Sequence, residues 1–435
     1  LDREWSWSEW ENVPVRVDLN GTKFDISTGI NVNHSGGSDG DEYAADDGLS
    51  TLVVLKSLTL AKDQTLTLNA GAGQKWFASL DGEGSIAYVG SGKEESSVDI
   101  RNVFDSVANI YAGKTDVSKI TLNLYRQNSF GANALVTASD AVINTQSSSA
   151  FAFANSLDYD NVEHHFAEGQ TAFNVYNADG EAAEFTGTNS FNASSSSAFA
   201  FTVAGDMNVG AANQTGSTAF SNSGNGGIDL HVNGDLTVYA GSTVTGANKV
   251  TADDNLNLYT VGGIDADSTL TIGKALNFID AEGTFAHDAE HNTTDGRFAV
   301  SLSNSNIVYD QGLTLAASGT TLKDESTLIA SAQSYNVQLG ESVDFLRDKG
   351  EDRSQLIVTG ENAAGRLNFG NIKLSGDGLT VLRGNTPVGS EGSTDIAFAS
   401  GLDLSGYTGW IRLENGTQAL TQDQADFINQ STSAG

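Results

Sequence analysis

Short motifs recur along this chain at intervals of 20–26 residues, and this recurrence constrains the fold more than any other feature. An Ala-Phe pair after a small polar residue gives Phe151, Phe173, Phe199 and Phe220, and a later register gives Leu236, Leu256 and Leu276. The interval is too long for one hairpin arm and too short for a propeller blade. It suits one coil of a solenoid, in which equivalent residues of successive coils lie on top of each other.

The local pattern within each interval is that of strands. Runs such as Leu58-Thr59-Leu60, Leu66-Thr67-Leu68 and Leu236-Thr237-Val238 alternate apolar and polar residues, with Gly, Asn, Asp and Ser clusters between them. We therefore predict an all-β chain that folds as a right-handed three-stranded parallel β-helix, a solenoid with capped ends. A pair of β-sandwiches is the alternative, but it does not explain the recurrence. The four phenylalanines are expected to form an interior aromatic stack.

Three regions follow from this prediction. Residues 1–50 are expected to hold an N-terminal cap and the first coils, because the tryptophans of Trp5–Trp10 suit the cover of an open coil end, although a sugar-stacking platform is the alternative. Residues 51–420 are assigned to the β-helix. Residues 421–435 form a C-terminal end segment in which Thr421 is placed to cap a short helix over 422–428.

Charge and cysteine content exclude several functions. The chain has 55 Asp plus Glu against 22 Lys plus Arg, a net charge of -33, and no cysteine. Such a chain is a poor ligand for nucleic acid or anionic lipid, and it forms no disulfide or thiolate metal site. Residues 127–248 contain no Lys or Arg, whereas two windows run against the acidic trend: Lys93–Arg126 has five basic and five acidic residues, and Arg347–Arg383 has six and five. Ordinary solvated turns are the favoured interpretation of both windows, and binding is the alternative.

Two histidine-containing segments raise the question of a metal site. Asp158–His165 holds three carboxylates and two histidines, and His287 and His291 are four residues apart. Neither segment meets a fixed ligand spacing, and a zinc-binding helix would need Glu directly after His287, where the chain has Asp288. We interpret the first as a charged loop that leaves the rod and the second as a surface loop, and we predict no metal and no cofactor.

Other motifs are equally weak. Gly36–Glu42 has the composition of a calcium loop but not its pattern, and Gly224–Asp229 is predicted to be a turn. The carboxylate pairs Asp46-Asp47 and Asp253-Asp254 allow glycoside hydrolysis in principle, but such pairs are expected by chance among 55 acidic residues. We therefore predict no enzymatic activity.

The coil texture resembles a known family. The stretch Val232–Val244 and the run Leu404–Gly416 are similar to coils of the passenger domains of bacterial type V, AIDA-type autotransporter adhesins. The resemblance lies in texture and period, and it covers most of the chain. It implies a protein on the bacterial cell surface, anchored through a C-terminal outer-membrane barrel that follows Gly435, with glycosaminoglycans and fibronectin as partners and no membrane insertion of this segment. Self-association is a further possibility.

We nominate glycan-binding residues from the less acidic window and from neighbouring loop amides and carboxylates: Arg101, Lys114, Asp116, Lys119, Arg126, Asn128, Asn155, Asn177 and Asp179. Rows of Asn and Asp on one face of the rod are a second route, because their side chains can hydrogen-bond sugar hydroxyls at successive coils. A β-helical polysaccharide lyase or hydrolase and a self-associating aggregation or biofilm factor are the alternative functions.

Overall fold

We describe the fold from a computed structural model of the chain. It describes residues 16–17, 52–60, 65–70, 75–82, 85–100, 110–111, 114–125, 135–148, 151–177, 179–287, 289–291, 298–309, 317–331, 339–347, 352–360, 366–368, 372–384, 395–397 and 403–414. These residues fall into two compact units. Unit 1 comprises 1–205 with 218–228, and unit 2 comprises 206–217 with 229–435.

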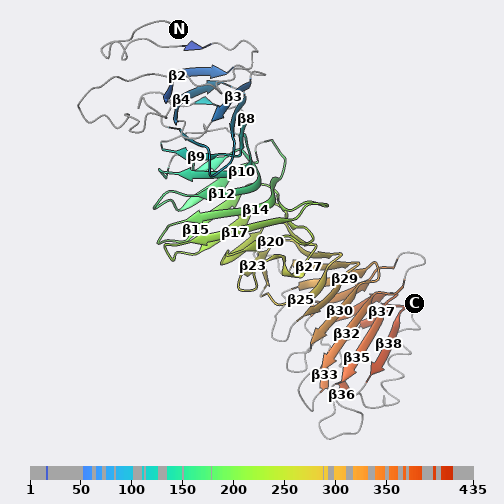
Figure 1. The fold of residues 1–435 in the computed structure, drawn as a ribbon. Coiled ribbons are helices and arrows are strands. Elements are labelled where there is room, and N and C mark those ends of the chain that lie inside the picture. Colours follow the sequence, from blue (N-terminus) through green and yellow to red (C-terminus); the bar gives the residue numbers. More distant parts are fainter. Residues whose placement is uncertain are drawn as a thin grey trace, which may run out of the picture. The chain divides into compact units, whose positions relative to one another are not determined.

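Unit 1 is built from three sets of stacked strands (Figure 1). The main sheet contains β3 (Thr65–Ala70), β5 (Ser85–Gly90), β6 (Ser97–Ile100), β8 (Lys114–Ser118), β9 (Thr121–Leu124), β10 (Leu135–Thr145), β12 (Ser156–His165), β14 (Ala183–Ala193) and most of β17 (Gly216–Asn222). A second set contains β1 (Arg16–Val17), β2 (Leu52–Leu60), β4 (Lys75–Gly82) and β7 (Ile110–Tyr111). The third contains β11 (Phe153–Ala154), β13 (Ala172–Val175) and β15 (Phe199–Val203).

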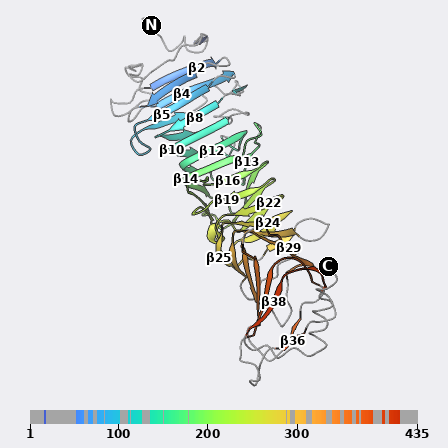
Figure 2. The same ribbon diagram turned by 90° about the vertical axis from the view of Figure 1, so that its right-hand side faces the viewer.

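Unit 2 also has three sheets (Figure 2). Its main sheet contains β16 (Met207–Val209), β19 (Leu236–Val238), β22 (Asn255–Leu258), β24 (Ala275–Ile279), β27 (Phe298–Ser303), β29 (Ala317–Lys323), β31 (Ser342–Phe345), β34 (Lys373–Gly376) and β37 (Asp403–Tyr407). The second contains β18 (Ile228–Val232), β21 (Lys249–Ala252), β23 (Thr269–Ile272) and β26 (Ala289–His291). The third contains β25 (Glu282–Phe285), β28 (Asn306–Tyr309), β30 (Thr327–Ser331), β32 (Gln355–Gly360), β35 (Leu379–Gly384) and β38 (Trp410–Glu414).

The remaining described elements are short: β20 (Thr243–Thr245), β33 (Arg366–Asn368), β36 (Asp395–Ala397) and the 3-10 turn η2 (Val261–Gly263). Neighbouring strands pair in parallel, and most pair with a strand of the next coil rather than with the next strand in sequence; the pairs β1–β2 and β9–β10 join consecutive strands. This confirms the predicted all-β, three-stranded parallel β-helix. None of the helical segments among the described residues has the length and apolarity needed to span a membrane.

The predicted aromatic stack exists, with one member exchanged. Phe151, Phe173, Phe199 and Phe220 are all buried. However, Phe173 is in register with Phe201, and the two rings lie 5.4 Å apart, while Phe201 also contacts Phe220 at 5.3 Å. Phe199 instead packs on Phe166 at 4.6 Å. Because Phe199 and Phe201 are two residues apart on β15, both side chains point inward, and the register decides which one extends the stack.

The main sheet of unit 1 bends at a corner whose residues adopt the left-handed backbone conformation. Lys119, Asp140, Asn161 and Gly187 occupy this corner with φ between 48° and 65°. Asn161 donates to the carboxylate of Asp140 and accepts from the backbone N–H of Thr188. A Cβ on Gly187 would lie 2.4 Å from the Asn161 side-chain oxygen, so glycine fits both the dihedral and the space.

Unit 2 stacks aliphatic residues in its main sheet. Leu236, Leu256 and Leu276 are in register, as the 20-residue spacing predicts, and all three are buried. A buried serine ladder lines the corner before the third sheet: the backbone N–H of Ser305 donates to Ser326 Oγ, and that of Ser326 donates to Ser354 Oγ, each at 3.1 Å. These hydroxyls satisfy backbone groups that the turn would otherwise leave unpaired.

The motif predictions outside the sheets have mixed outcomes. The turn predicted over Gly224–Asp229 is found at residues 223–225, while Ile228 and Asp229 already belong to β18. A Cβ on Gly226 would lie 1.9 Å from the Ser197 carbonyl oxygen, so the backbones approach closely there. The tryptophans of Trp5–Trp10, the segment Gly36–Glu42, the pair Asp46-Asp47 and the end segment 421–435 lie outside the described residues.

Candidate functional site

The nominated glycan-binding residues are brought together only in part. Lys114 and Asp116 lie on β8, and Lys119 lies in the corner turn at the other end of that strand. Asn155 lies between β11 and β12, and Asn177 and Asp179 follow β13, so these three share one corner of the coil in successive turns. Arg101, Arg126 and Asn128 lie outside the described residues.

Carboxylates lie close to Lys114. Lys114 Nζ lies 3.0 Å from Asp116 Oδ1, and Asp116 shares an outward row with Thr137 and Asp158 in the next two coils. Burial raises the pKa of the Asp158 carboxyl, an effect that Lys114 opposes and Asp160 reinforces. The outer face around Lys114 therefore carries at least as much negative as positive charge.

The segment Asp158–His165 is not a loop, which corrects the sequence-based interpretation. It forms most of strand β12, and its alternate side chains enter the core. His164 is fully buried, its ring stacks on Phe151 at 5.4 Å, and its Nδ1 lies 3.3 Å from the Tyr159 hydroxyl. Burial, reinforced by His165, lowers the pKa of His164 to about 3, so the ring is neutral. His165 faces outward and pairs with Glu163 at 2.7 Å.

The second histidine segment also departs from the surface-loop interpretation. His287 is buried and lies 5.3 Å from the Phe285 ring, and residues 289–291 form strand β26. Burial lowers the pKa of His287, although hydrogen bonds between its ring and the backbone of Ser268 and Ile264 oppose the shift. Among the described residues, no three His, Asp or Glu side chains gather in a way that would hold a metal ion.

A row of hydrogen-bonded polar side chains runs along the outer face of the main sheet of unit 2. Asn277 Nδ2 donates to Asn257 Oδ1 at 2.8 Å, and Asn257 Nδ2 donates to Thr237 Oγ1 at 3.2 Å. The strands β19, β22 and β24 place these residues in register, so the row advances about 4.8 Å per coil. We call Thr237, Asn257 and Asn277 the amide ladder.

The amide ladder keeps hydrogen-bonding capacity toward solvent. A carboxamide offers two N–H donors and an oxygen with two lone pairs. Each ladder bond uses one of the two donors of its asparagine, and the side chains are half-buried at the sheet surface. The ladder therefore presents the donors and acceptors that polyhydroxylated ligands require, at a fixed spacing.

Two tyrosines flank the amide ladder. Tyr239 and Tyr259 follow β19 and β22 at equivalent positions of successive coils, and their rings stack at 5.1 Å with an interplanar angle of 15°. Both are half-buried and lie two residues beyond Thr237 and Asn257, on the same outward side of the sheet. Aromatic faces next to amides are a frequent combination in ligand sites, because the ring contributes apolar contact while the amides fix orientation.

Carboxylates with polar or basic partners border this face. Asn255 Nδ2 donates to Asp235 Oδ1 at 2.8 Å, Lys274 Nζ lies 2.5 Å from Asp254, and His231 lies 2.9 Å from Asp253. The adjacent carboxylates Asp253 and Asp254 thus have different partners, His231 and Lys274. Glycoside hydrolysis uses two carboxyl groups that face each other across the sugar, and Asp253 and Asp254 are not arranged in this way.

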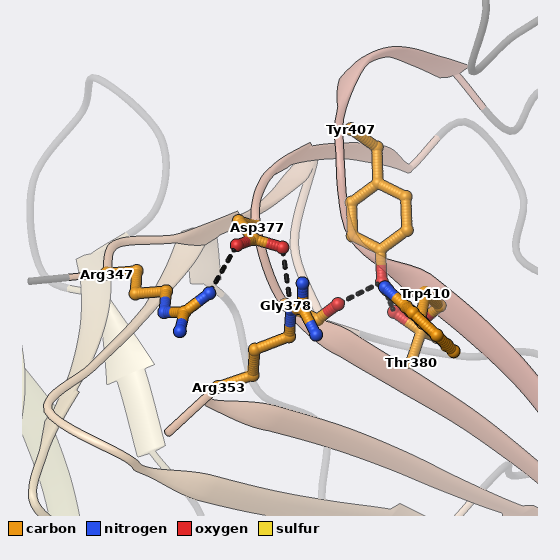
Figure 3. A network of polar contacts seen from close by, with 7 residues as sticks. All are labelled: Arg347, Arg353, Asp377, Gly378, Thr380, Tyr407 and Trp410. Atoms are coloured by element: carbon orange, nitrogen blue, oxygen red, sulfur yellow. Dashed lines mark hydrogen bonds and ion pairs between the residues drawn. The ribbon is translucent and has the colours of Figure 1, made fainter. Parts of the chain in front are cut away.

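A second cluster lies in the later coils of unit 2. It joins Arg347, Arg353 and Asp377 to the exposed ring of Trp410 (Figure 3). The sequence interpretation counted both arginines in a less acidic window but did not nominate them. It predicted rows of Asn and Asp on one face of the rod but did not name Asn257 and Asn277, although these residues, like Tyr239 and Tyr259, stand 20 residues apart.

The chain matched no protein-family model, no curated protein and no solved structure in the comparisons that we made. The functional argument therefore rests on the geometry of these two surfaces.

Proposed function

We propose that this chain is a non-catalytic adhesin that binds extended glycans along the outer face of its β-helix. The amide ladder flanked by Tyr239 and Tyr259 carries the proposal, because it repeats the same hydrogen-bonding groups once per coil. The coil spacing of about 4.8 Å is comparable to the length that one pyranose adds to an extended polysaccharide. Successive sugars then meet equivalent groups, and weak contacts add up through multivalency.

The setting that we propose is the bacterial cell surface, with matrix glycosaminoglycans and glycoproteins such as fibronectin as partners. The resemblance of the coils to autotransporter passenger domains supports this setting. The net charge of -33 repels sulphated polymers over long distances, so their association with the chain should be slow at low salt. We therefore expect binding to strengthen from low to physiological ionic strength, the opposite of a contact driven by basic residues.

The experiment is binding of the purified chain to immobilised chondroitin sulphate, heparin and fibronectin, with each polymer sized afterwards. Saturable binding that returns intact polymer supports the adhesin. Shortened polymer would replace it with a β-helical lyase or hydrolase. Failure to bind any of the three would overturn the proposal and leave self-association as the function to test by concentration-dependent mass.

Variants locate the binding to the proposed face. Asn257→Ala removes one ladder residue, and we expect about a fivefold loss of affinity for each hydrogen bond of ~1 kcal/mol. Asn144→Ala is the matched control, because Asn144 Nδ2 donates to Asn123 Oδ1 at 2.8 Å in an equivalent ladder bond of unit 1. Equal losses in the two variants would show that the amide ladder of unit 2 is not the site.

A further inference from the structure

The cluster around Trp410 is built from segments that are distant in sequence. Arg347 follows β31, Arg353 precedes β32, Asp377 lies in the turn between β34 and β35, and Trp410 begins β38. Arg347 Nη1 lies 2.8 Å from Asp377 Oδ2, and Arg353 Nε lies 2.7 Å from Asp377 Oδ1 (Figure 3). One carboxylate therefore fixes two guanidinium groups, and the two arginines hold the pKa of Asp377 below its usual value.

Arg353 also contacts an aromatic face. Its Cζ lies 5.5 Å from the centroid of the Trp410 ring, within the range of a cation–π interaction. Trp410 is 65% exposed, more than any other large apolar side chain among the described residues. Burial of this ring therefore contributes little to the fold, and its exposed face, held beside a guanidinium group, is open to a ligand.

The backbone beneath the ring is firmly held. Tyr407 is buried, and its hydroxyl donates to the carbonyl oxygen of Trp410 at 2.7 Å, while the carbonyl oxygen of Gly378 lies 3.0 Å away. Thr380 Oγ1 lies 3.1 Å from the same hydroxyl. The exposed ring thus projects from a rigid base, which lowers the entropy cost of binding a ligand on it.

The surroundings of Trp410 are less acidic than the chain as a whole. Arg353 lies over the ring, Arg347 is joined to it through Asp377, and the exposed Arg412, two residues after Trp410 on β38, leaves the same face of the strand. The nearby carboxylates are Asp377, Asp352 and Glu325. In a chain with a net charge of -33, this concentration of arginine favours an anionic ligand.

We propose that the Trp410 cluster is a second glycan subsite, selective for a sugar that carries a carboxylate. The apolar face of the pyranose packs on the exposed indole ring, and the planar guanidinium of Arg353 recognises the carboxylate beside it. The inference rests on the proposed glycan binding, but it concerns a different surface from the amide ladder. It adds selectivity for an acidic sugar, which the neutral amides of the ladder do not supply.

The test measures binding of two hexasaccharides to the full chain by calorimetry and by tryptophan fluorescence. One probe alternates glucuronate with N-acetylglucosamine, and the other is the neutral N-acetylglucosamine hexamer. We expect the acidic probe to bind and to quench fluorescence, and the neutral probe to bind at least about tenfold more weakly. The quenching should be absent in Trp410→Phe, because the remaining four tryptophans are Trp5, Trp7, Trp10 and Trp76.

Substitutions separate recognition from structural support. Trp410→Ala and Arg353→Lys should each reduce affinity for the acidic probe about tenfold, the latter because lysine keeps the charge but loses the planar fork. Lys373→Gln is the charge-matched control, since it removes one exposed cation on the main sheet of the same unit. Thermal melting of each variant verifies that the fold is retained.

The outcomes distinguish this inference from the proposed function. Unchanged affinity in Trp410→Ala, equal affinity for the neutral hexamer, or absence of quenching would overturn the subsite and leave the cluster as a structural clamp. Binding of long polymers that depends on Asn257 but not on Trp410 would retain the proposed function alone. Loss of acidic-probe binding in Asn257→Ala but not in Trp410→Ala would assign the selectivity to the ladder and also overturn the subsite.

Discussion

The two units fill the same kind of coil in different ways. In unit 1 the coils around β12 and β14 are long, with Val162 bonded to Asn189 27 residues later, and their interior holds rings such as Phe173, Phe185 and Phe191. In unit 2 the coils of β19, β22 and β24 repeat after 20 residues and hold leucines. Coil length does not by itself set side-chain size, because Leu258 stacks on Phe278 20 residues later and Met207 stacks on Leu236 29 residues later. Close packing is therefore met at each stacked position separately.

The comparison shows that each stacked position is filled to fit its neighbours in the adjacent coils. A ring added at a leucine position would be overpacked, and a ring removed from the aromatic stack would leave a void. The following predictions test this matching, from the largest expected effect to the smallest.

Removal of a ring from the long coils should have the largest effect. Phe173→Ala deletes a fully buried ring that contacts Phe151, Phe166 and Phe201, and we expect a loss of ~3–5 kcal/mol in the free energy of unfolding. Urea unfolding followed by hydrogen exchange measures the loss and locates it. Phe153→Ala is the matched control, because Phe153 is only half-buried, and its effect should be much smaller. Equal effects would contradict the interior stack.

Acid should weaken unit 1 through His164. Its pKa is about 3 in the folded chain and about 6.5 in the unfolded chain, so between these values the unfolded state binds a proton that the folded state excludes. Stability is thus retained above pH 6.5 and falls by ~1.4 kcal/mol per pH unit as the pH drops toward 3.

The carboxylates of the chain contribute their own pH dependence, so the measurement is a difference. Unfolding free energies of the wild type and of His164→Phe are compared at pH 7.0 and pH 4.5. We expect the stability of the wild type to fall by roughly 3 kcal/mol more than that of the variant. Parallel pH profiles would show that His164 is protonated in the folded state as readily as in the unfolded one.

Adding a ring at a stacked leucine position should cost less stability than removing a ring from the aromatic stack. Leu256→Phe introduces a ring between Leu236 and Leu276, and we expect a destabilisation of ~1–3 kcal/mol as neighbouring side chains leave their preferred rotamers. Chemical denaturation provides the value. Were Leu256→Phe neutral or stabilising, the proposed close fit of the stacked leucines would not hold.

The serine ladder of unit 2 should make the smallest contribution of the four. Ser326→Ala removes the acceptor of the buried Ser305 N–H, and an unsatisfied buried donor costs ~1–2 kcal/mol. Ser301→Ala, a half-buried serine on the outer face of the main sheet, should change stability by less than ~0.5 kcal/mol. A drop in thermal stability that is the same for both would argue against a special role of the ladder.

Periodicity predicted the fold well because a solenoid repeats its own interior. The stacking of Leu236, Leu256 and Leu276 could be read directly from their spacing. The same reasoning placed Phe199 in the stack on Phe173, whereas the register places Phe201 there. Both side chains point inward on β15, so the alternation alone could not distinguish them. The sequence interpretation also took Asp158–His165 for a loop, because its charged residues hide the alternation that places Tyr159 and His164 in the core.

The candidate sites were harder to predict. The amide ladder depends on which side of the strand each asparagine faces, and the alternation with Leu256 and Leu258 contained that information. The Trp410 cluster had no such signal. Arg347, Arg353, Asp377 and Trp410 come from four segments, and only the stacking of three coils places them together.

The sequence by itself determined that this chain forms stacked parallel coils, since hydrophobic period and turn residues act locally and repeat. It also determined the charge balance that disfavours nucleic acid and anionic lipid. The tertiary structure alone decided which phenylalanines meet, that His164 is buried and neutral, and that two arginines share Asp377 beside an exposed tryptophan. These features depend on the register between coils, which is set by the packing of many residues at once rather than by any one of them.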